Sequence, residues 1–469
     1  MNIATASRER AKINLRKIRA YGYYGVGKVL RSMGRDSERF IRHIFYYPKV
    51  KDIATLADLV NRATWYLPQS TFSQVEVSIP VDTKLLGTNL ESLVPPPSQY
   101  NYIGRHENIH LIDLHKADLS QADAIMLWDK RSMFDPRILW HLARVNVADP
   151  WYYYIVESFL YPRFCFQSLE SQQKKHFIQL SKNNYQALLN KVAAYKRGYV
   201  FGTGPSLDQA TEFDYDEGFR VICNTIVKNK RLLKHIKPQL LVFLDPAFFF
   251  SPCLYSAEFR RMMLETVQEF QCHIMVPNYI VPLLLSHYPE LETKIIGMPI
   301  PGLLDMSLRE IIRMIFRNPI NNVLSNLPVQ TKIPGHREVY NFPTIDKFYV
   351  RASSSVMTMY MIPIVSSVCE EIYIIGADGR KPDENYFWTH NPSSQFGDLM
   401  KTLFDTHPSF FRDAVYTDAY KGHCDFFENL LRYGESMGKK YYSLTPSYIP
   451  ALAKRPAPSE KMGRNKYNE

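Results

Sequence analysis

The stretch from Tyr199 to Leu207 is the feature of this sequence that most constrains its fold. Its first three residues are apolar and predict a short buried strand, after which Gly202 and Gly204 open a tight turn. Pro205 suits the first turn of a helix, where its missing N–H costs nothing. The free amides of such a turn predict an anion-binding concavity, with phosphate as the expected guest. Packing alone also accounts for many glycine-rich turns, so both interpretations remain open at this point.

Strand-like and helix-like segments alternate along the rest of the chain, which indicates a parallel sheet. The expected strands are 75–79, 109–113, 124–128, 151–156, 199–201, 219–223, 240–244, 273–276, 294–296, 371–375 and 440–444. The expected helices are 53–66, 137–145, 168–197, 228–236, 259–270, 303–317, 357–368 and 426–437. The pattern predicts an α/β protein with a Rossmann-like parallel sheet, helices on both faces, and a smaller α/β domain before it.

The chain has 469 residues with 46% hydrophobic content, enough for two or three domains with real cores. We expect a basic helical arm at 1–51, an N-terminal α/β domain at 52–196, a main domain at 197–450 and a basic tail at 451–469. Residues 380–425 show no clean period and are rich in aromatic, polar and His residues. We therefore predict that residues 380–425 form a lid over the main domain.

The net charge of +11 is concentrated at the two ends of the chain. Residues 1–51 hold 13 Lys and Arg against 3 acidic residues, and Leu15, Ile18 and Tyr21 recur there at helical spacing. Two interpretations stay open: a basic amphipathic helix on an anionic membrane surface, or a solvated arm. Nucleic-acid binding is not expected, because the aromatic residues do not interleave with basic ones as a stacking platform requires.

The six cysteines are scattered without a C-x-x-C pair, which indicates reduced thiols and argues against a zinc site. No apolar run approaches the roughly 20 residues of a membrane span, and the N-terminus lacks the apolar core of a secretory signal. We expect a cytoplasmic protein, at most peripheral on the inner face of the cell membrane.

Polar residues stand directly after four of the expected strands, namely Thr203, Asn224, Asp245 and Asp378. Each alone is ordinary turn chemistry. In an open parallel sheet, however, the carboxyl ends of the strands share one edge, and ligands bind in the crevice there. Four such residues beside a phosphate-type turn therefore predict a nucleotide site.

Six short motifs occur in order along the main domain: Gly202-Thr-Gly-Pro-Ser-Leu207, Cys223-Asn224, Asp245-Pro246 with Phe248-Phe249, Arg351-Ala-Ser-Ser354, Ile372-Tyr-Ile-Ile-Gly-Ala-Asp378 and Tyr420-Lys-Gly-His423. Residues 197–450 thereby resemble the bacterial sialyltransferases of glycosyltransferase family 42. The corresponding segments of that family read GNGPSL, CN, NP with two Phe, R-I-T-S, IYLSGID and Y-I-G-H. Residues 1–196 lie outside the resemblance.

The resemblance implies a glycosyltransferase-A-like fold and an inverting transfer that needs neither metal nor cofactor. The donor would be a CMP-activated sialic acid or a related ulosonic acid, and the acceptor would be a glycan hydroxyl. Residues 1–196 have their own βα pattern outside the resemblance, and we expect them to form a second lobe that binds the acceptor glycan or docks the enzyme at the membrane.

The resemblance also assigns donor contacts. It places the donor phosphate and sugar beside Gly202, Thr203, Gly204 and Ser206, and the ribose or phosphate region at Asn224. It also assigns sugar and phosphate contacts to Ser353 and Ser354, and support of the reacting centre to Arg351. The backbone of Gly376, Ala377 and Asp378 would recognise the cytosine base. Asp245 stands where the family has Asn, which leaves its contact unassigned.

The catalytic assignments follow the departing phosphate and the attacking hydroxyl. In the family two lid tyrosines hydrogen-bond the phosphate; Tyr386 matches one, and Arg380 would replace the other as a cationic partner. Tyr420 is singled out by its spacing to His423, which matches the general base. The chemistry itself asks for such groups, since without a metal polar side chains must stabilise the leaving phosphate. An imidazole with a pKa near neutrality is an efficient base.

Other interpretations remain. The alternative to a general base at His423 is a surface histidine, or a metal-bound histidine with Cys424 and Asp425 beside it. The glycine turn and Asp245-Pro246 also resemble the 6-hydroxymethylpterin diphosphokinase-like family, in which Asp245 and Asp378 would hold Mg²⁺. A catalytically degenerate sugar-nucleotide-binding scaffold in glycan assembly is the third alternative.

Overall fold

The computed structural model describes residues 41–114, 118–151, 161–215, 217–301, 340–353, 355–380, 392–409 and 416–458. Most of the basic arm, residues 152–156 of the expected strand 151–156, the expected helix 303–317, Ser354 and Tyr386 therefore lie outside the described residues, as does most of the basic tail. Within those residues no helix is long and apolar enough to cross a membrane.

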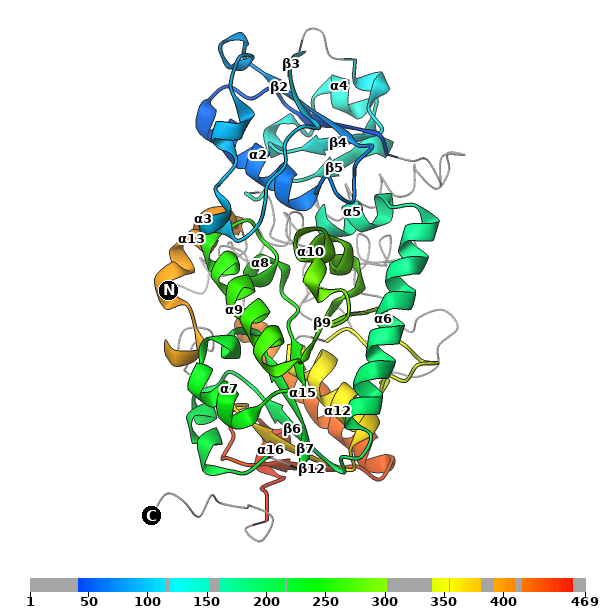
Figure 1. Cartoon of the computed structure of the whole chain (residues 1–469), viewed down its shortest axis with the longest axis vertical. Helices are drawn as coiled ribbons and strands as arrows, with labels where there is room; N and C mark the ends of the chain where they lie inside the picture. The colour runs from blue at the N-terminus through cyan, green and yellow to red at the C-terminus, as the bar shows by residue number, and fades with distance from the viewer. Residues whose placement is uncertain are drawn as a thin grey trace, which may run out of the picture.

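Two sheets, each with all neighbouring strands parallel, form two lobes stacked along the long axis of the molecule (Figure 1). In the described residues the first lobe (41–151) has five strands in the order β3-β2-β1-β4-β5, and the second lobe (161–458) has seven in the order β10-β9-β8-β7-β6-β11-β12. The first-lobe strands are β1 (His43–Tyr47), β2 (Glu76–Val81), β3 (Ile109–Asp113), β4 (Ala124–Leu127) and β5 (Val145–Val147). The second-lobe strands are β6 (Arg197–Phe201), β7 (Gly218–Cys223), β8 (Leu240–Val242), β9 (His273–Pro277), β10 (Ile295–Met298), β11 (Glu371–Ile375) and β12 (Lys440–Ser443).

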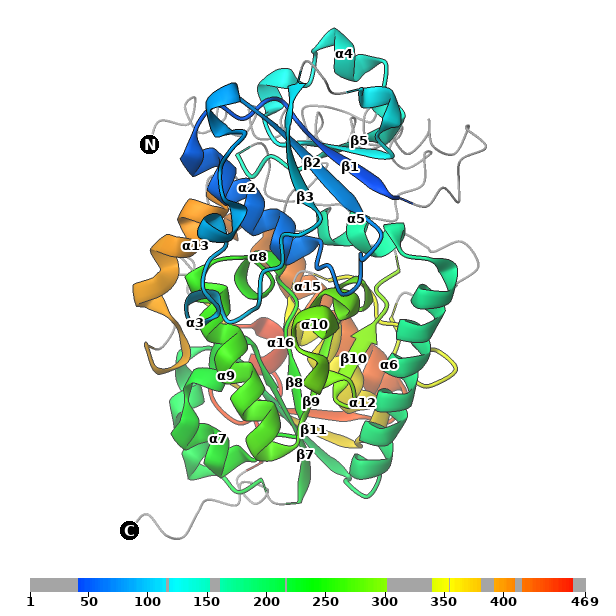
Figure 2. The same cartoon turned by 45° about the horizontal axis from the view of Figure 1, so that its top comes forward.

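Helices cover both faces of the second sheet, as predicted for a Rossmann-like fold (Figure 2). Helix α6 packs along β10, and α12 packs on β6 and β11. The helices of the described residues are α2 (Ile53–Tyr66), α3 (Pro97–Tyr100), α4 (Pro136–Leu139), α5 (Tyr161–Ser168), α6 (Ser171–Val192), α7 (Lys230–Ile236), α8 (Pro246–Phe249), α9 (Leu254–Phe270), α10 (Val281–His287), α12 (Ile362–Val368), α13 (Met400–Thr406), α15 (Tyr416–Ser436) and α16 (Pro450–Ala453). A 3₁₀ segment, η8 (Pro205–Glu212), follows β6, and a π-helical turn, η12 (Met357–Met361), precedes α12.

The strand order of the second sheet reverses between β6 and β11. From β6 the chain adds β7, β8, β9 and β10 on one side, and then returns to add β11 and β12 on the other. Phe201 at the end of β6 is in register with Ile222 on one neighbour and Ile375 on the other. The carboxyl ends of β6 and β11 therefore flank the topological switch point, where ligands of open α/β sheets bind.

Two predictions for the first lobe are wrong. Residues 43–47, expected within a helical arm, form the central strand β1. The run His-Ile-Phe-Tyr-Tyr has high β propensity and is almost wholly buried. The basic residues on either side of it led to its prediction as part of the arm. The expected helix 137–145 is instead the short helix α4, a 3₁₀ turn (Leu142–Arg144) and strand β5, since Val145-Asn-Val147 favours a strand.

A buried tryptophan on α2 joins the two lobes. The indole N–H of Trp65 donates to the carbonyl of Phe250 at 2.6 Å. One face of the ring stacks on His287, with centroids 4.5 Å apart, and the guanidinium of Arg260 lies 4.2 Å from the ring centroid. Because Phe250 follows α8, which follows β8, the first lobe packs against the carboxyl edge of the second sheet.

Candidate functional site

The centre of the candidate site is a backbone-to-backbone contact at the switch point. Gly202 N donates to Ile375 O at 2.8 Å, and Gly204 N donates to Gly376 O at 2.9 Å. A Cβ at Gly376 would lie 2.2 Å from the Gly202 carbonyl oxygen, and Gly376 has φ +71°. Only glycine permits this conformation and this approach. The predicted glycine turn is thus real, with Thr203 partly exposed between its two glycines.

The amide expected to bind phosphate is already bonded to a carboxylate of the chain. Ser206 N donates to both carboxylate oxygens of Asp378 at 3.2 Å. The Ser206 hydroxyl accepts from Gly376 N at 3.2 Å and from the Thr445 hydroxyl at 3.0 Å. The Ser206 amide therefore contacts a side-chain carboxyl group of the chain itself, and phosphate binding at the turn stays a prediction.

Most backbone groups of residues 376–378 are engaged as well. The Ala377 carbonyl accepts from the Ser447 hydroxyl at 2.6 Å, and the Asp378 carbonyl accepts from Tyr448 N at 2.7 Å. The resemblance assigns these backbone groups to binding of the cytosine base. That role stays a prediction, and it is not favoured because the two carbonyls already accept hydrogen bonds within the chain. The sequence analysis missed the supporting segment 445–448, although its Thr-Pro-Ser run directly follows a strand in the way that drew attention to the other edge residues.

Asn224 carries two signs of a functional position. It follows β7 with φ +51°, a left-handed conformation that non-glycine residues rarely adopt. Its side-chain oxygen is buried and has no hydrogen-bond partner among the described residues. A buried acceptor without a partner, on a strained backbone, is typical of a group held for a ligand.

Asp245 caps α8 by accepting from Ala247 N at 3.0 Å. Burial raises the pKa of its carboxyl to about 6, although the backbone hydrogen bond and the charge of His407 act in the opposite direction. The side chain still retains partial exposure. A desolvated carboxyl in a crevice is a common mark of a functional site.

Two tyrosines that the sequence analysis did not single out line the same region. The hydroxyls of Tyr279 and Tyr360 are buried and have no hydrogen-bond partner among the described residues. Burial raises the pKa of both hydroxyls, and the charge of Asp245 adds to the rise for Tyr279. Tyr279 lies two residues after β9, in a short 3₁₀ turn, and this closeness to a strand end was a usable signal. Tyr360 lies in the π-helical turn η12, a feature often found at functional sites.

The segment around Arg351 approaches the edge from the end of β10. Val350 N donates to Pro299 O at 3.0 Å, and the Arg351 guanidinium lies 5.8 Å from the Tyr349 ring centroid. The Ser353 hydroxyl bonds the Thr358 hydroxyl at 2.7 Å. The segment of Arg351 and Ser353 is therefore attached at the carboxyl end of β10, and the donor contacts expected of both residues stay predictions.

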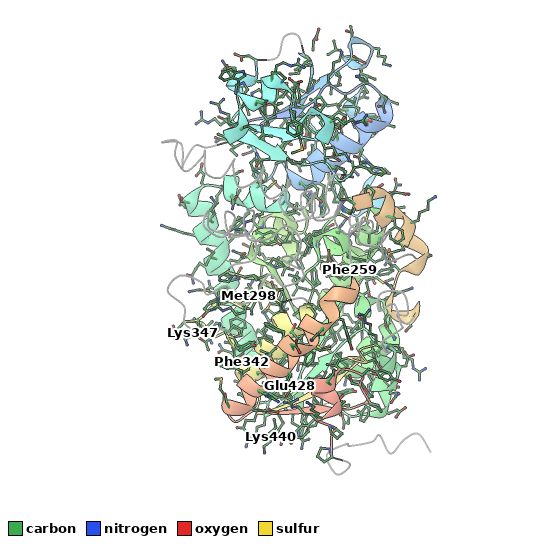
Figure 3. All side chains as sticks on the ribbon, turned by 180° about the vertical axis from the view of Figure 1, so that it is seen from behind. Phe259, Met298, Phe342, Lys347, Glu428 and Lys440 are labelled. Atoms are coloured by element: carbon green, nitrogen blue, oxygen red, sulfur yellow. The ribbon has the colours of Figure 1, made fainter. Side chains whose placement is uncertain are left out.

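The segment that carries Tyr420 and His423 is helical, although the sequence shows no clean period there, and its role as part of a lid stays a prediction. Both belong to α15, which in the view from behind rises diagonally from the level of Lys440 past Glu428 (Figure 3). Tyr420, His423 and Phe427 follow helical spacing, but Gly422 and the polar aromatics obscured the period. Residues 392–406 of the expected lid also contain a helix, α13.

Helix α15 nevertheless brings Tyr420 to the carboxyl edge. Arg380 N donates to the Tyr420 hydroxyl at 3.2 Å, and the Arg380 guanidinium lies 4.6 Å from the Tyr420 ring centroid. His423 is one helical turn further on, with its ring centroid 6.4 Å from that of Tyr420 and 5.7 Å from that of Phe427. The cation–π contact holds Arg380 beside the strand end, where the sequence analysis expects a phosphate partner.

Burial lowers the pKa of His423 to about 4, below the near-neutral value expected for a general base. The imidazole is therefore neutral at pH 7, and it accepts a proton with less driving force than an imidazole whose pKa is near 7. An anionic substrate beside the ring would raise this pKa and strengthen the base.

The diphosphokinase alternative requires Asp245 and Asp378 to share a metal ion. Asp245 follows β8 and Asp378 follows β11, and two strands lie between these. Three strand spacings correspond to about 14 Å, too far for two carboxylates to ligate one ion. No cluster of three or more His, Cys, Asp and Glu side chains suited to a metal lies within the described part of the chain.

No protein-family model matches the sequence, and no curated protein matches it. Among solved structures, the chain is similar to the sialyltransferase CstII from Campylobacter jejuni in complex with the substrate analogue CMP-3FNeuAc, at 16% identity and a TM-score of 0.30, over 58% of this chain and 92% of that chain. It is also similar to the monofunctional alpha-2,3-sialyltransferase Cst-I from the same organism, at 16% identity and a TM-score of 0.32, over 56% of this chain and 81% of that chain. At these values the likeness is too weak to transfer the role of any residue.

Proposed function

We propose that this protein is an inverting, metal-independent glycosyltransferase that moves sialic acid or a related ulosonic acid from a CMP-sugar to a glycan hydroxyl. One observation carries the proposal. The glycine turn at 202–204 meets Gly376 at the switch point of β6 and β11, and Arg380 with Tyr420 lies beside the end of β11. This is the edge at which open parallel sheets bind nucleotides, and that agreement supports the proposal.

The donor is held from both sides of the switch point. The glycine turn at 202–204 lets the ligand approach the backbone, and the unpartnered side-chain oxygen of Asn224 accepts from a ribose hydroxyl. Arg380, held beside the end of β11 by Tyr420, stabilises the phosphate as it departs, and Arg351 supports the reacting centre.

In the reaction, the bond between the anomeric carbon and the phosphate oxygen breaks, and its electron pair leaves with CMP. The acceptor oxygen forms the new bond from the opposite face, and its proton passes to the neutral imidazole of His423. The Tyr420 hydroxyl fixes the backbone of Arg380 beside the departing phosphate.

The first test combines nucleotide binding with transfer. The full chain is scanned for thermal stabilisation by CMP, CDP, UDP, GDP and ATP with Mg²⁺, since a ligand of the folded state raises apparent stability. We expect selective stabilisation by CMP, transfer from CMP-sialic acid that EDTA leaves intact, and a loss of about 10²–10⁴-fold in transfer rate for His423→Gln with CMP binding retained. The control is His176→Gln, on the solvent-exposed part of α6.

Two results would contradict the proposal. Selective stabilisation by ATP with Mg²⁺ would favour the diphosphokinase class, and full transfer activity in His423→Gln would remove the base assignment.

We further propose that the part of the 1–51 arm that precedes β1, residues 1–40, docks the enzyme on an anionic membrane surface. Its 10 basic residues against 3 acidic ones support this, with electrostatic attraction worth about 1 kcal/mol per basic residue near such a surface. Vesicles rich in phosphatidylserine should sediment the full chain but not a chain lacking residues 1–40, a deletion that stops before β1. Equal sedimentation of the two chains would make the segment a plain solvated arm.

A further inference from the structure

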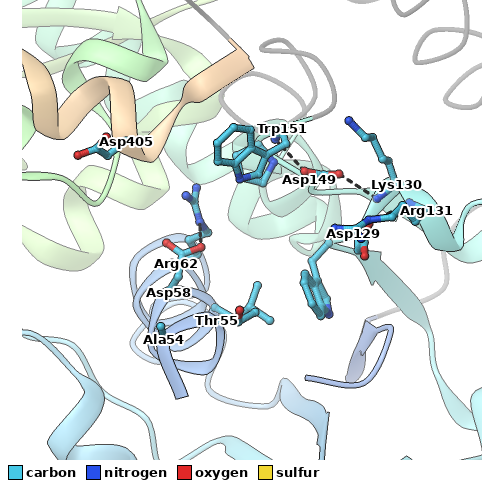
Figure 4. Close-up of a pocket in the computed structure, with 13 residues that line it drawn as sticks. Ala54, Thr55, Asp58, Arg62, Asp129, Lys130, Arg131, Asp149, Trp151 and Asp405 are labelled. Carbon is cyan, nitrogen blue, oxygen red and sulfur yellow. Dashed lines mark hydrogen bonds and ion pairs between the residues drawn. The ribbon is translucent and has the colours of Figure 1, made fainter. Parts of the chain in front are cut away.

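The first lobe has a cleft of its own at the carboxyl edge of its sheet. The strand order of this sheet reverses between β1 and β4, so its switch point lies between these two strands. A cleft of 540 Å³ opens there between α2, the segment after β4 and the segment after β5 (Figure 4). This volume lies within the range of about 300–1,000 Å³ typical of small-molecule sites, which favour such switch points.

The charges that line the cleft are nearly balanced. Four carboxylates face three cations, and several are tied to neighbours. Arg62 Nε donates to Asp58 at 2.8 Å, and the buried Asp149 accepts from Lys130 N at 2.8 Å and from Trp151 N at 2.7 Å. A net charge near zero does not attract a polyanion such as a nucleotide, whereas fixed carboxylates and guanidinium groups suit a ligand rich in hydroxyls.

Two indole rings complete the lining. Trp151 is 61% exposed, and the partly buried Trp128 is fixed by a hydrogen bond of 2.7 Å from its indole N–H to Pro48 O. An exposed ring beside polar groups offers an apolar face together with nearby donors and acceptors. A sugar ring presents the matching combination, with an apolar C–H face and polar hydroxyl edges.

The cleft is connected to the edge of the second sheet through the end of α13. Asp405 lines the cleft, and the carbonyl of the next residue, Thr406, accepts from the Arg62 guanidinium at 2.9 Å. His407 then lies close enough to Asp245 for its charge to lower the pKa of that carboxyl. Three consecutive residues thus run from the first-lobe cleft to the candidate active site.

We propose that this cleft binds the acceptor as a neutral oligosaccharide and directs one end of it toward the edge of the second sheet. The inference rests on the proposed function, because it names the acceptor of that transfer. Trp151 supplies the stacking face, Lys130 and Arg62 contact hydroxyls, and α13 guides the chain of sugars toward Asp245.

The test uses Trp151→Ala, with Trp140→Ala as the matched control. The hydrogen bond from Trp151 to Asp149 comes from the backbone N–H of residue 151, so alanine at this position keeps it. Trp140 is 88% exposed and does not line the cleft. The full chain and both variants are applied to an array of immobilised neutral and acidic oligosaccharides. We expect neutral ligands to bind, and Trp151→Ala to lose at least tenfold in affinity while Trp140→Ala stays unchanged.

Transfer kinetics provide the second readout. With an oligosaccharide from the array as acceptor, Trp151→Ala should raise the acceptor KM about tenfold and leave the donor KM and the thermal stabilisation by CMP unchanged. Lys130→Ala should change the same parameters in the same direction.

The outcomes separate the two proposals. Absence of CMP binding in the unaltered chain would count against the proposed function, whatever the array shows. CMP binding with no neutral ligand on the array, with acidic ligands only, or with equal binding by Trp151→Ala would overturn the cleft proposal alone.

Discussion

The two lobes share one topological feature but differ in the groups that surround it. Each has an open parallel sheet whose strand order reverses once, and each has its candidate site at that reversal. In the second lobe the reversal is closed by backbone, with Gly202 and Gly376 in direct contact. In the first lobe it opens into a cleft lined by long charged and aromatic side chains.

The difference teaches what each edge can recognise. An edge made of backbone presents fixed amides and carbonyls at short range, which suits a small ligand of fixed shape such as a nucleotide. An edge made of side chains offers more area and adapts its contacts, which suits an extended polar ligand. One reversal of strand order is therefore compatible with two kinds of candidate site. The residues that follow the strands determine which kind each lobe presents.

The largest expected effect comes from breaking the backbone contact with Gly376→Ala. The new Cβ would meet the Gly202 carbonyl at 2.2 Å on a backbone with positive φ, so we expect a loss of about 2–5 kcal/mol in the free energy of unfolding. Urea denaturation measures this loss. Gly397→Ala is the control, because its Cβ would meet nothing within 4 Å. Equal stability of the two variants would show that the edge is not built on this contact.

An intermediate effect, in the stabilising direction, is expected for Asp245→Asn. The folded-state pKa of about 6 lies above the ordinary value of 3.8, so the carboxyl favours folding below pH 4 and that contribution is lost as the pH rises through 6. Asparagine keeps the oxygen that caps α8 and removes the buried charge. We expect a gain of about 1–3 kcal/mol at pH 8 that vanishes near pH 4. Chemical denaturation across this range tests it, and a gain that is independent of pH would contradict desolvation of the carboxylate as its cause.

The smallest effect should come from the side-chain edge of the first lobe. Arg131 is 87% exposed and contacts Asp129 at 3.4 Å, and exposed pairs of this kind contribute little. Arg131→Ala should therefore change the free energy of unfolding by less than about 0.5 kcal/mol in the same urea experiment. A loss comparable to that of Gly376→Ala would remove the contrast between the two edges.

The sheet of the second lobe was largely predictable from the sequence, because its strands are apolar runs that end in glycine, Asn or Asp. Strand 371–375 and helix 53–66 were predicted at their observed bounds. The convergence of Asn224, Asp245 and the glycine turn on one edge also follows from sequence order and parallel pairing. The central strand β1 was not predictable in this way, because its surrounding basic residues resemble those of the arm before it.

The contacts within the candidate site could not be predicted from local sequence patterns. The bond from Ser206 N to Asp378 joins two strands that are neighbours only after the sheet forms. The positions of Tyr279 and Tyr360 depend on packing of η12 over the sheet, and the low pKa of His423 depends on its burial beside Phe427. Such properties arise from tertiary surroundings, which a window of neighbouring residues does not contain.

The carboxylate of Asp378 has a consequence for ligand choice. A phosphate that binds the glycine turn competes with a group tethered a few ångströms away, whose effective concentration is in the millimolar range or above. If the turn binds phosphate as proposed, a small monovalent anion would displace this carboxylate poorly, whereas a doubly charged phosphate that is also held through its nucleoside would displace it. Under the proposed function, the turn would therefore select ligands that have a second point of attachment.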